Sequence, residues 1–320
     1  MSTAAAHLGS GTRVIVTGAS GFIGAAVTQR LLQAGATVHA LYRRTPPGVA
    51  AGAIWRQCDL EQEDTVLRTF DAVRPDVVIH LASHVSGGRD LALVGPTLRS
   101  NLLSTVNVLT AASRVGSRRV VLTGSMEEPV PASEWPVPCS PYAAAKFAAS
   151  AYGRLFYQLY RTPVVMLRLF MVYGPGQRDR TKLVPYTVTS LLNGTAPRLS
   201  NGRRNIDWVY VDDVVEAYLR AGCADGIDGQ TIDIASGTAV TVRSLVQRVV
   251  DLVNPAIRPQ FGAVPERAAE QEPVANLVPA ERLLQWRATT SLEDGLARTV
   301  DWYRRYVAAS SVVAASVDQQ

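Results

Sequence analysis

The chain has 320 residues, 47% of them hydrophobic and 18% charged, which allows one large domain or two smaller ones with a substantial core. This composition excludes a disordered chain, and no apolar run in the sequence reaches membrane-spanning length. The formal charge of +5 is mild, and no long Lys/Arg run indicates a nucleic-acid partner.

The three cysteines, Cys58, Cys139 and Cys223, are scattered and show neither a disulfide framework nor zinc-ligand spacing. The four histidines do not cluster with carboxylates, so we expect no metal site. Residues 1–11 lack the basic start and long apolar centre of a signal peptide. We therefore expect a cytoplasmic protein that binds neither nucleic acid nor a membrane.

A strand, a glycine turn and a helix follow one another near the start of the sequence. Arg13–Thr17 is a β-branched run, and Phe22–Leu32 has apolar residues at helical period. This order directs backbone N–H groups and a helix N-terminus toward a pyrophosphate, although a glycine turn alone can be only a tight loop. The expected cofactor contacts are Gly18, Ser20, Gly21, Phe22, Ile23 and Gly24.

The second predicted strand, Thr37–Tyr42, is followed directly by Arg43 and Arg44. Enzymes that use NAD commonly place an acidic residue near this point to hold the ribose 2′-hydroxyl. Two guanidiniums without a carboxylate favour a 2′-phosphate, and hence NADP(H) over NAD(H). The alternative is that both arginines are solvated loop residues.

Later segments continue the alternation of strands and helices. Further strands are expected at 53–58, 76–81, 119–123 and 164–169, with helices at 96–115 and 141–160. This rhythm predicts the α/β class, with a doubly wound parallel Rossmann sheet in residues 1–173 that binds NADP. Asp59 and Leu60 end the third strand; Leu81, Ala82 and Ser83 end the fourth and would let the cofactor lie close.

The pattern is less regular from Gly174 onward. Residues 174–308 are expected to form most of a smaller, irregular C-terminal substrate-binding domain with an interleaved boundary, including helices at 211–222 and 292–306. Residues 309–320 have little to pack against and are predicted to be a mobile tail.

Tyr142 and Lys146 lie four residues apart, on one face of the helix predicted at 141–160. An ammonium close to the phenol would favour the phenolate and ease proton transfer near neutral pH. Ser125, just past the strand at 119–123, could hydrogen-bond the same reacting oxygen. A Tyr and a Lys at this spacing are more often only neighbours on a helix surface. The other motifs of the sequence therefore decide whether this pair is catalytic.

In this context the sequence resembles the extended short-chain dehydrogenase/reductase family of nucleotide-sugar epimerases, dehydratases and reductases. The matching motifs span about residues 13–305: Thr17-Gly-Ala-Ser-Gly-Phe-Ile-Gly24, Asp59-Leu60, His80-Leu-Ala82, Asn101, Ser125, Tyr142-x3-Lys146, Val172-Tyr-Gly-Pro175 and Trp208-Val-Tyr-Val-Asp-Asp213. The resemblance implies a Ser125/Tyr142/Lys146 triad, with Lys146 also on the nicotinamide ribose. It implies that Asn101 holds a structural water or a backbone kink near Lys146.

The segment Ser125-Met126-Glu127 bears on the type of reaction. Nucleotide-sugar 4,6-dehydratases of this family usually have Thr-Asp-Glu here, with the Asp as acid and the Glu as base. Glu127 is kept, but the Met126 thioether has no proton to give. The segment is more similar to the Gly-Ser-Ser-Glu-Glu of 4-keto-6-deoxyhexose reductases.

Two further departures concern the substrate. Met171 and Ile206 stand where the family commonly has an Asn and an Arg that touch the diphosphate. Arg203, Arg204 and Arg267 are possible substitutes. Met126, Met171 and these three arginines are therefore the predicted substrate-binding residues.

The resemblance implies an NADPH-dependent reductase of a nucleotide-linked 4-keto-6-deoxysugar, with Tyr142 as proton donor. A nucleotide-sugar 4-epimerase and a reductase of another natural-product ketone remain open. A cofactor-binding regulator without turnover is disfavoured, because a sensor needs no acid–base phenol. The helices at 96–115 and 141–160 pair with their copies in the family, so we also expect a homodimer.

Overall fold

The computed structural model describes residues 8–44, 51–129, 136–267 and 270–317, and the chain divides into two compact units. The first unit consists of Met1–Phe170, Val214–Ile234 and Pro273–Arg287; the second consists of Met171–Asp213, Ala235–Glu272 and Ala288–Gln320. The chain thus first leaves the first unit at Phe170, close to the predicted boundary at residue 173. The assignment of cofactor and substrate binding to separate parts of the chain remains a prediction.

A seven-stranded parallel sheet forms the centre of the first unit, in the order β10-β6-β5-β4-β1-β2-β3. Its strands are β1 (Arg13–Thr17), β2 (Thr37–Tyr42), β3 (Ile54–Gln57), β4 (Val77–His80), β5 (Arg119–Ser125), β6 (Val164–Leu169) and β10 (Thr231–Ile234). The chain order reverses between β1 and β4, and ligands bind α/β sheets at the carboxyl ends of strands beside such a reversal. The predicted fold class is confirmed.

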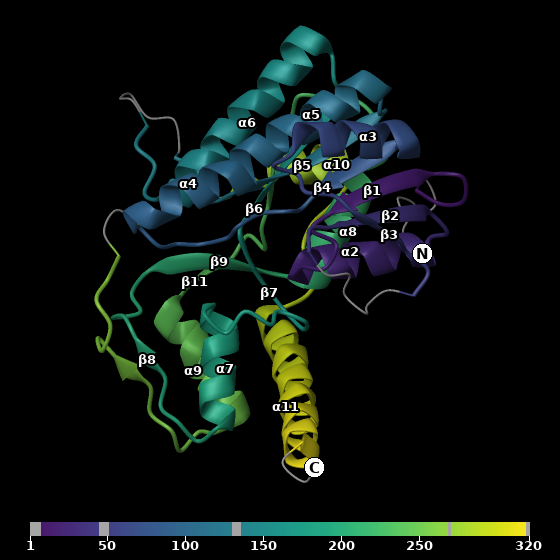
Figure 1. Cartoon of the computed structure of the whole chain (residues 1–320). Helices are drawn as coiled ribbons and strands as arrows, with labels where there is room; N and C mark the ends of the chain where they lie inside the picture. The colour runs from purple at the N-terminus through teal and green to yellow at the C-terminus, as the bar shows by residue number, and fades with distance from the viewer. Residues whose placement is uncertain (1–7, 45–50, 130–135, 268–269, 318–320) are drawn as a thin grey trace. The chain divides into compact units, whose positions relative to one another are not determined.

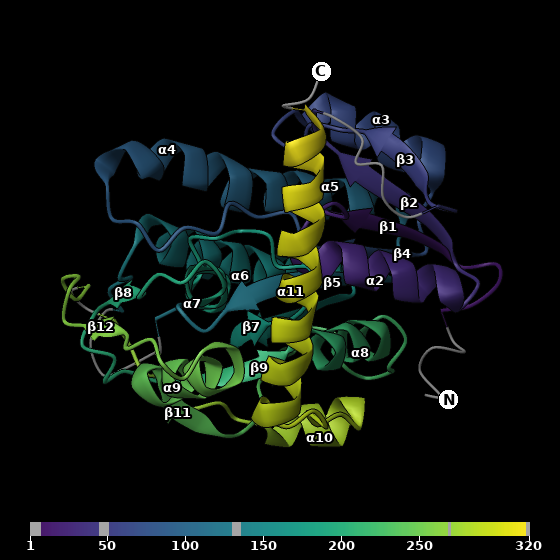
Figure 2. The ribbon, with the colours of Figure 1, turned by 90° about the horizontal axis from the view of Figure 1, so that it is seen from below.

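Helices cover both faces of this sheet (Figure 1). α3 (Glu63–Val73), α5 (Ser104–Val115) and α6 (Pro141–Tyr160) lie on one face, where Val66, Phe70, Val108, Leu109 and Phe156 pack with Ile15, Val78 and Val120 of the strands. α2 (Phe22–Gln33) and α8 (Val211–Ala221) lie on the opposite face, toward the viewer in Figure 2. An ion pair of 3.6 Å joins Arg30 of α2 to Glu216 of α8. The short α10 (Val278–Leu284) packs beside β10.

The glycine turn after β1 packs against the end of β4. Gly18 has φ +65°, and a Cβ there would lie 2.7 Å from the Ala82 backbone nitrogen. A Cβ on Gly24 would lie 2.0 Å from the Gly18 carbonyl oxygen. Both glycines are therefore required by the packing of the protein on itself, and the close approach brings residue 82 next to the turn.

The sequence predicted one regular helix at 96–115, but the helical run before β5 is irregular. It follows a short 3₁₀ turn (η1, Leu91–Leu93) and consists of α4 (Val94–Thr97), the π-helical segment η2 (Leu98–Leu103) and α5. Gly116, with φ +72°, ends it. π-Helical turns are frequent at functional sites, and this one contains Asn101.

In its described residues, the second unit contains a three-stranded sheet, a two-stranded sheet and three helices. The strands are β7 (Met171–Tyr173), β9 (Asn205–Tyr210) and β11 (Ala239–Thr241), with β8 (Arg198–Leu199) pairing β12 (Gln260–Phe261); the helices are α7 (Leu183–Leu192), α9 (Val242–Val253) and α11 (Leu292–Val317). The Asp213 carboxylate accepts hydrogen bonds from Thr289 and Thr290, which fixes the start of this last segment.

The last helix, α11, continues to Val317 and not only to the predicted Tyr306. The mobility predicted for residues 309–320 remains a prediction, and residues 318–320 lie outside the described part. Across the described residues, no helix combines the length and the apolar character that crossing a membrane requires.

Candidate active site

Helix α6 carries the predicted proton-transfer residues. The Ser140 hydroxyl caps its N-terminus by accepting from the Ala143 N–H at 3.1 Å, and Pro141 occupies the first turn. Tyr142 and Lys146 lie on the buried face of the helix, 8% and 4% exposed. Their side chains are therefore fixed by packing and not free on the surface.

The structure brings Tyr142, Lys146 and Ser125 together beside the end of β5. Ser125 is the last residue of β5, because the strand runs two residues beyond its predicted end at Thr123. The Lys146 ammonium donates to the Thr123 carbonyl at 2.9 Å and lies 5.9 Å from the centroid of the Tyr142 ring. The three residues that the resemblance implied as a triad thus share one buried site.

Burial acts in opposite senses on the two titrating groups. It raises the pKa of Tyr142, and the charges of Glu127 and Glu128 raise it further, whereas hydrogen bonding to Ser125 and Ser83 lowers it. Burial lowers the pKa of Lys146 to about 8, against an opposing effect of the Glu128 charge. Without cofactor, Tyr142 therefore holds its proton at neutral pH; the expected phenolate needs further positive charge beside it.

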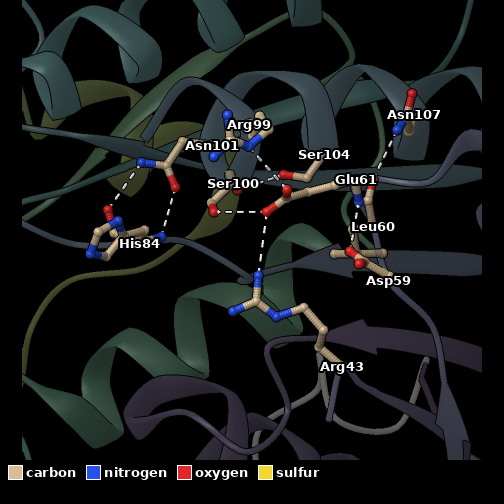
Figure 3. A network of polar contacts seen from close by, with 10 residues as sticks. All are labelled: Arg43, Asp59, Leu60, Glu61, His84, Arg99, Ser100, Asn101, Ser104 and Asn107. Carbon is tan, nitrogen blue, oxygen red and sulfur yellow. Dashed lines mark hydrogen bonds and ion pairs between the residues drawn. The ribbon is translucent and has the colours of Figure 1, made fainter. Parts of the chain in front are cut away.

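Asn101 connects the π-helical turn to the segment after β4. Its Oδ1 accepts from the His84 N–H at 2.7 Å, and its amide donates to the His84 carbonyl at 3.0 Å (Figure 3). The same Oδ1 also accepts from the Ser83 hydroxyl at 3.1 Å. Since Ser83 also hydrogen-bonds Tyr142, Asn101 positions a neighbour of the phenol. The sequence led us to expect that Asn101 holds a structural water or a backbone kink near Lys146, and that role remains a prediction. The structure shows direct hydrogen bonds of Asn101 with Ser83 and His84.

Glu128 is a buried residue of the site that the sequence did not single out. Its carboxylate accepts from the Ser125 N–H at 2.8 Å and from the Ser150 hydroxyl at 2.7 Å. Ser150 is one turn beyond Lys146 on α6, so Glu128 ties the end of β5 to the face of α6 that carries the reactive groups. Gly124 makes room for it, because a Cβ there would lie 2.8 Å from the carboxylate.

The two residues between Ser125 and Glu128 differ in chemistry. Met126 is 4% exposed, and its N–H donates to the Leu169 carbonyl at 2.9 Å. Glu127 is half-buried, and its N–H donates to the Ser125 hydroxyl at 3.1 Å. The charge of the Glu127 carboxylate acts on Tyr142, whereas the side chain at 126 is a buried thioether.

The start of α2 fits the pyrophosphate of a dinucleotide. Gly21 occupies the N-cap, where no side chain caps the helix, and the first turn, which contains Phe22 and Ile23, carries no acidic residue. Backbone N–H groups of such a turn bind anions. Gly18, Ser20 and Gly24 belong to the same turn, so the predicted phosphate-binding residues lie together.

Thr17 and His80 support this edge of the sheet and were not predicted as site residues. The Thr17 hydroxyl accepts from the N–H groups of Leu81 and Ala82, each at 3.1 Å. The buried His80 ring bridges the hydroxyls of Thr17 at 2.8 Å and Thr105 at 3.0 Å. Burial and the charge of Lys146 lower the pKa of His80 to about 3, so this residue is a neutral bridge at physiological pH.

Arg43, which the sequence predicted to bind an anionic phosphate, lies beside a carboxylate of the protein itself. Its Nη1 lies 3.3 Å from Glu61 Oε1, at the end of the segment that contains Asp59 and Leu60 (Figure 3). Asp59 Oδ1 accepts from the Glu61 N–H at 3.1 Å, and the Leu60 carbonyl accepts from the Asn107 amide at 2.9 Å. Arg44, next to Arg43, is exposed.

The second unit pairs two of the predicted substrate arginines with one carboxylate. Glu270 lies 3.2 Å from Arg204 and 3.7 Å from Arg267, and Arg204 also donates to the Gln271 carbonyl. Arg203 is exposed, and Met171 lies half-buried in β7, opposite Trp208 of β9. Among the described residues, no group of three or more His, Cys, Asp and Glu side chains is arranged to hold a metal ion.

Comparison with known proteins agrees with this geometry. A sequence model described as the NAD dependent epimerase/dehydratase family matches residues 14–235. The chain belongs to this family and is an NAD(P)-dependent enzyme of the extended short-chain dehydrogenase/reductase type, as the resemblance implied.

Three relatives illustrate the likeness. A UDP-glucose 4-epimerase of Mycolicibacterium smegmatis is 29% identical over 91% of this chain and 98% of its own length. The structure of a UDP-glucose 4-epimerase from Thermotoga maritima, solved with UDP-glucose, matches with TM-score 0.85 and 26% identity over 92% of this chain and 100% of that one. A dTDP-glucose 4,6-dehydratase from Streptomyces venezuelae, solved with NAD and TYD, matches with TM-score 0.81 and 27% identity over 92% and 97%.

Replacing Tyr142 by Phe is expected to lower turnover by about a hundredfold or more, because a positioned acid–base group contributes at least that much. The ring and its packing remain, so folding and cofactor binding should be unchanged. Steady-state rates, with cofactor binding measured in parallel, test this expectation. Tyr152→Phe, at an exposed position of α6, is the matched control. Near-normal rates in Tyr142→Phe would assign proton transfer to another group, with Glu127 next in line.

Replacing Glu128 by Gln should move the basic limb of the pH profile of kcat/KM to lower pH. The amide oxygen can still accept from Ser125, but the negative charge that raises the pKa of Lys146 is lost. The Lys146 pKa then falls below about 8, so its charge disappears at lower pH. Ser150→Ala keeps the Glu128 charge and should leave the limb in place. If the basic limb does not move in Glu128→Gln, the charge of Glu128 does not control the pKa of Lys146, and the residue serves only in packing.

Proposed function

We propose that this enzyme is a nucleotide-sugar 4-epimerase, which oxidises the C4 hydroxyl of a nucleotide-linked hexose and reduces the resulting ketone from the other face. The observation that carries the proposal is the combination of one buried acid–base phenol, Tyr142, with a buried thioether at position 126. Epimerisation needs a single proton-transfer group at C4. Elimination of water across C5–C6 needs in addition an acid at the departing hydroxyl, and Met126 has no proton to supply.

In this proposal Tyr142 takes the proton of the C4 hydroxyl and later returns it to the ketone oxygen. The Ser125 hydroxyl orients that oxygen, and the Lys146 ammonium favours the phenolate. A bound oxidised nicotinamide supplies the hydride acceptor and a positive charge that also favours the phenolate. The residues that would hold this cofactor are the start of α2 and the ends of β2 and β4.

The comparisons support an epimerase ahead of the ketoreductase expected from the sequence. The relatives named above are epimerases and a dehydratase, and the one solved with a nicotinamide cofactor holds NAD. The NADPH-dependent reductase of a nucleotide-linked 4-keto-6-deoxysugar, expected from the sequence, remains the second candidate. It is favoured by the likeness of Ser125-Met126-Glu127-Glu128 to reductases and by Arg43 and Arg44 at the end of β2.

The test is incubation with UDP-glucose, UDP-galactose and dTDP-glucose, followed by NMR of the products. We expect interconversion of the 4-epimers without net consumption of cofactor, no 4-keto-6-deoxy product, and tightly held NAD in the purified protein. Tyr142→Phe is the inactive control. Consumption of NADPH by a 4-keto sugar, with an empty site on purification, would favour the reductase. A 4-keto-6-deoxy product from dTDP-glucose would show that another group supplies the acid.

We also propose that the chain forms a homodimer through η2, α5 and α6. The sequence places apolar residues on both faces of these helices, and Leu98, Leu155 and Leu159 remain 49%, 39% and 64% exposed. Such large exposed apolar side chains on neighbouring helices are typical of interfaces. Light scattering at micromolar concentration should give a dimer mass, and Leu98→Glu with Leu155→Glu should lower it to that of a monomer. A monomer mass for the unaltered protein would contradict the proposal.

A further inference from the structure

Glu61 occupies a fixed position beside the end of β2. Its Oε1 lies 3.3 Å from Arg43 Nη1 and accepts from the Ser100 hydroxyl at 3.1 Å, and its Oε2 lies 3.5 Å from Arg99 Nε (Figure 3). The Glu61 side chain is 20% exposed, whereas those of Arg43 and Arg99 are 51% and 54% exposed. The carboxylate is therefore the more buried centre of the group, and the two arginines are its more exposed partners.

The position of this group matters because NAD and NADP differ only at the adenosine ribose. Dinucleotide-binding sheets of this topology hold the 2′ substituent near the end of the second strand, where an acidic residue accepts from a hydroxyl or an arginine receives a phosphate. Here Tyr42 and Arg43 stand at that strand end, and the nearby carboxylate comes from a different segment, after β3. The acidic residue therefore cannot be identified from its position in the sequence, because it does not follow β2 directly.

The pair with Glu61 changes what Arg43 can do. Arg43 already directs its guanidinium to Glu61, so a second anion must compete with that carboxylate, although a half-exposed ion pair by itself contributes little to stability. A 2′-phosphate at Arg43 would, however, bring about two negative charges beside a carboxylate that Ser100 and Arg99 hold in place. Repulsion between like charges penalises the phosphate, while a neutral 2′-hydroxyl meets no such penalty.

We propose that Glu61 is a specificity-determining residue that selects NAD(H) against NADP(H), by holding the Arg43 guanidinium and repelling a 2′-phosphate. In this view the arginines after β2 are not by themselves a signal for NADP. The proposal concerns cofactor binding alone, so it stands or falls independently of the sugar reaction proposed above.

The test is the dissociation constant of NADH and of NADPH for the intact protein stripped of cofactor, measured by nicotinamide fluorescence without any sugar. Glu61→Gln should tighten NADPH binding by about tenfold, the scale of one charge-assisted hydrogen bond gained and one repulsion lost, and change NADH binding by less than about threefold. Glu63→Gln, which removes the same charge at an exposed position of α3, should change neither constant.

A double-mutant cycle with Arg43→Ala identifies the partner. In the parent protein Arg43→Ala should change the NADPH to NADH affinity ratio by less than about threefold, because Glu61 holds the guanidinium. In the Glu61→Gln background it should abolish most of the gain in NADPH affinity. If Glu61→Gln does not fold, the effect of Arg43→Ala in the parent protein still tests the proposal by itself.

Three results would overturn the proposal. An unchanged NADPH to NADH ratio in folded Glu61→Gln would show that Glu61 does not select. An equal gain in Glu63→Gln would assign the effect to net charge. A tenfold loss of NADPH affinity in Arg43→Ala alone would show that Arg43 already serves the phosphate.

Discussion

The candidate active site depends on one set of polar contacts, the polar seam, between the end of β5 and helix α6. Lys146 donates to the Thr123 carbonyl, and the Glu128 carboxylate accepts from both the Ser125 N–H and the Ser150 hydroxyl. Lys146, Ser125, Glu128 and Ser150 are buried, and a buried polar group left without its partner is costly. The seam therefore fixes Tyr142 relative to Ser125, since both are attached to the two elements that it joins.

The same principle holds at the edge of the sheet where the cofactor is predicted to bind. Thr17 and the neutral His80 join β1, β4 and α5 through hydroxyl and imidazole contacts, and Asn101 holds the segment after β4 from the π-helical turn. The start of α2 has no side-chain cap, because its N-cap residue is Gly21. A rigid framework thus surrounds one set of backbone N–H groups that remain available to an anion.

Charge at the ends of β2 and β3 shows why local sequence can mislead. Arg43 and Arg44 are consecutive in the sequence and favour a phosphate when considered alone. Folding brings Glu61 to Arg43 from eighteen positions away, together with Arg99 from a third segment. The electrostatic character of this corner therefore depends on three parts of the chain that no local motif connects.

The sequence by itself determined the parallel sheet, the glycine turn and the Tyr142/Lys146 pair. These are local features: strand and helix periods, a turn between them, and two residues four apart on one helix. Only the tertiary structure decided the contacts of Glu128, His80 and Glu61, because their partners come from other elements of the fold. A hydrogen bond or ion pair across elements leaves no period or spacing in the sequence, so it becomes visible only when the strands and helices are packed together.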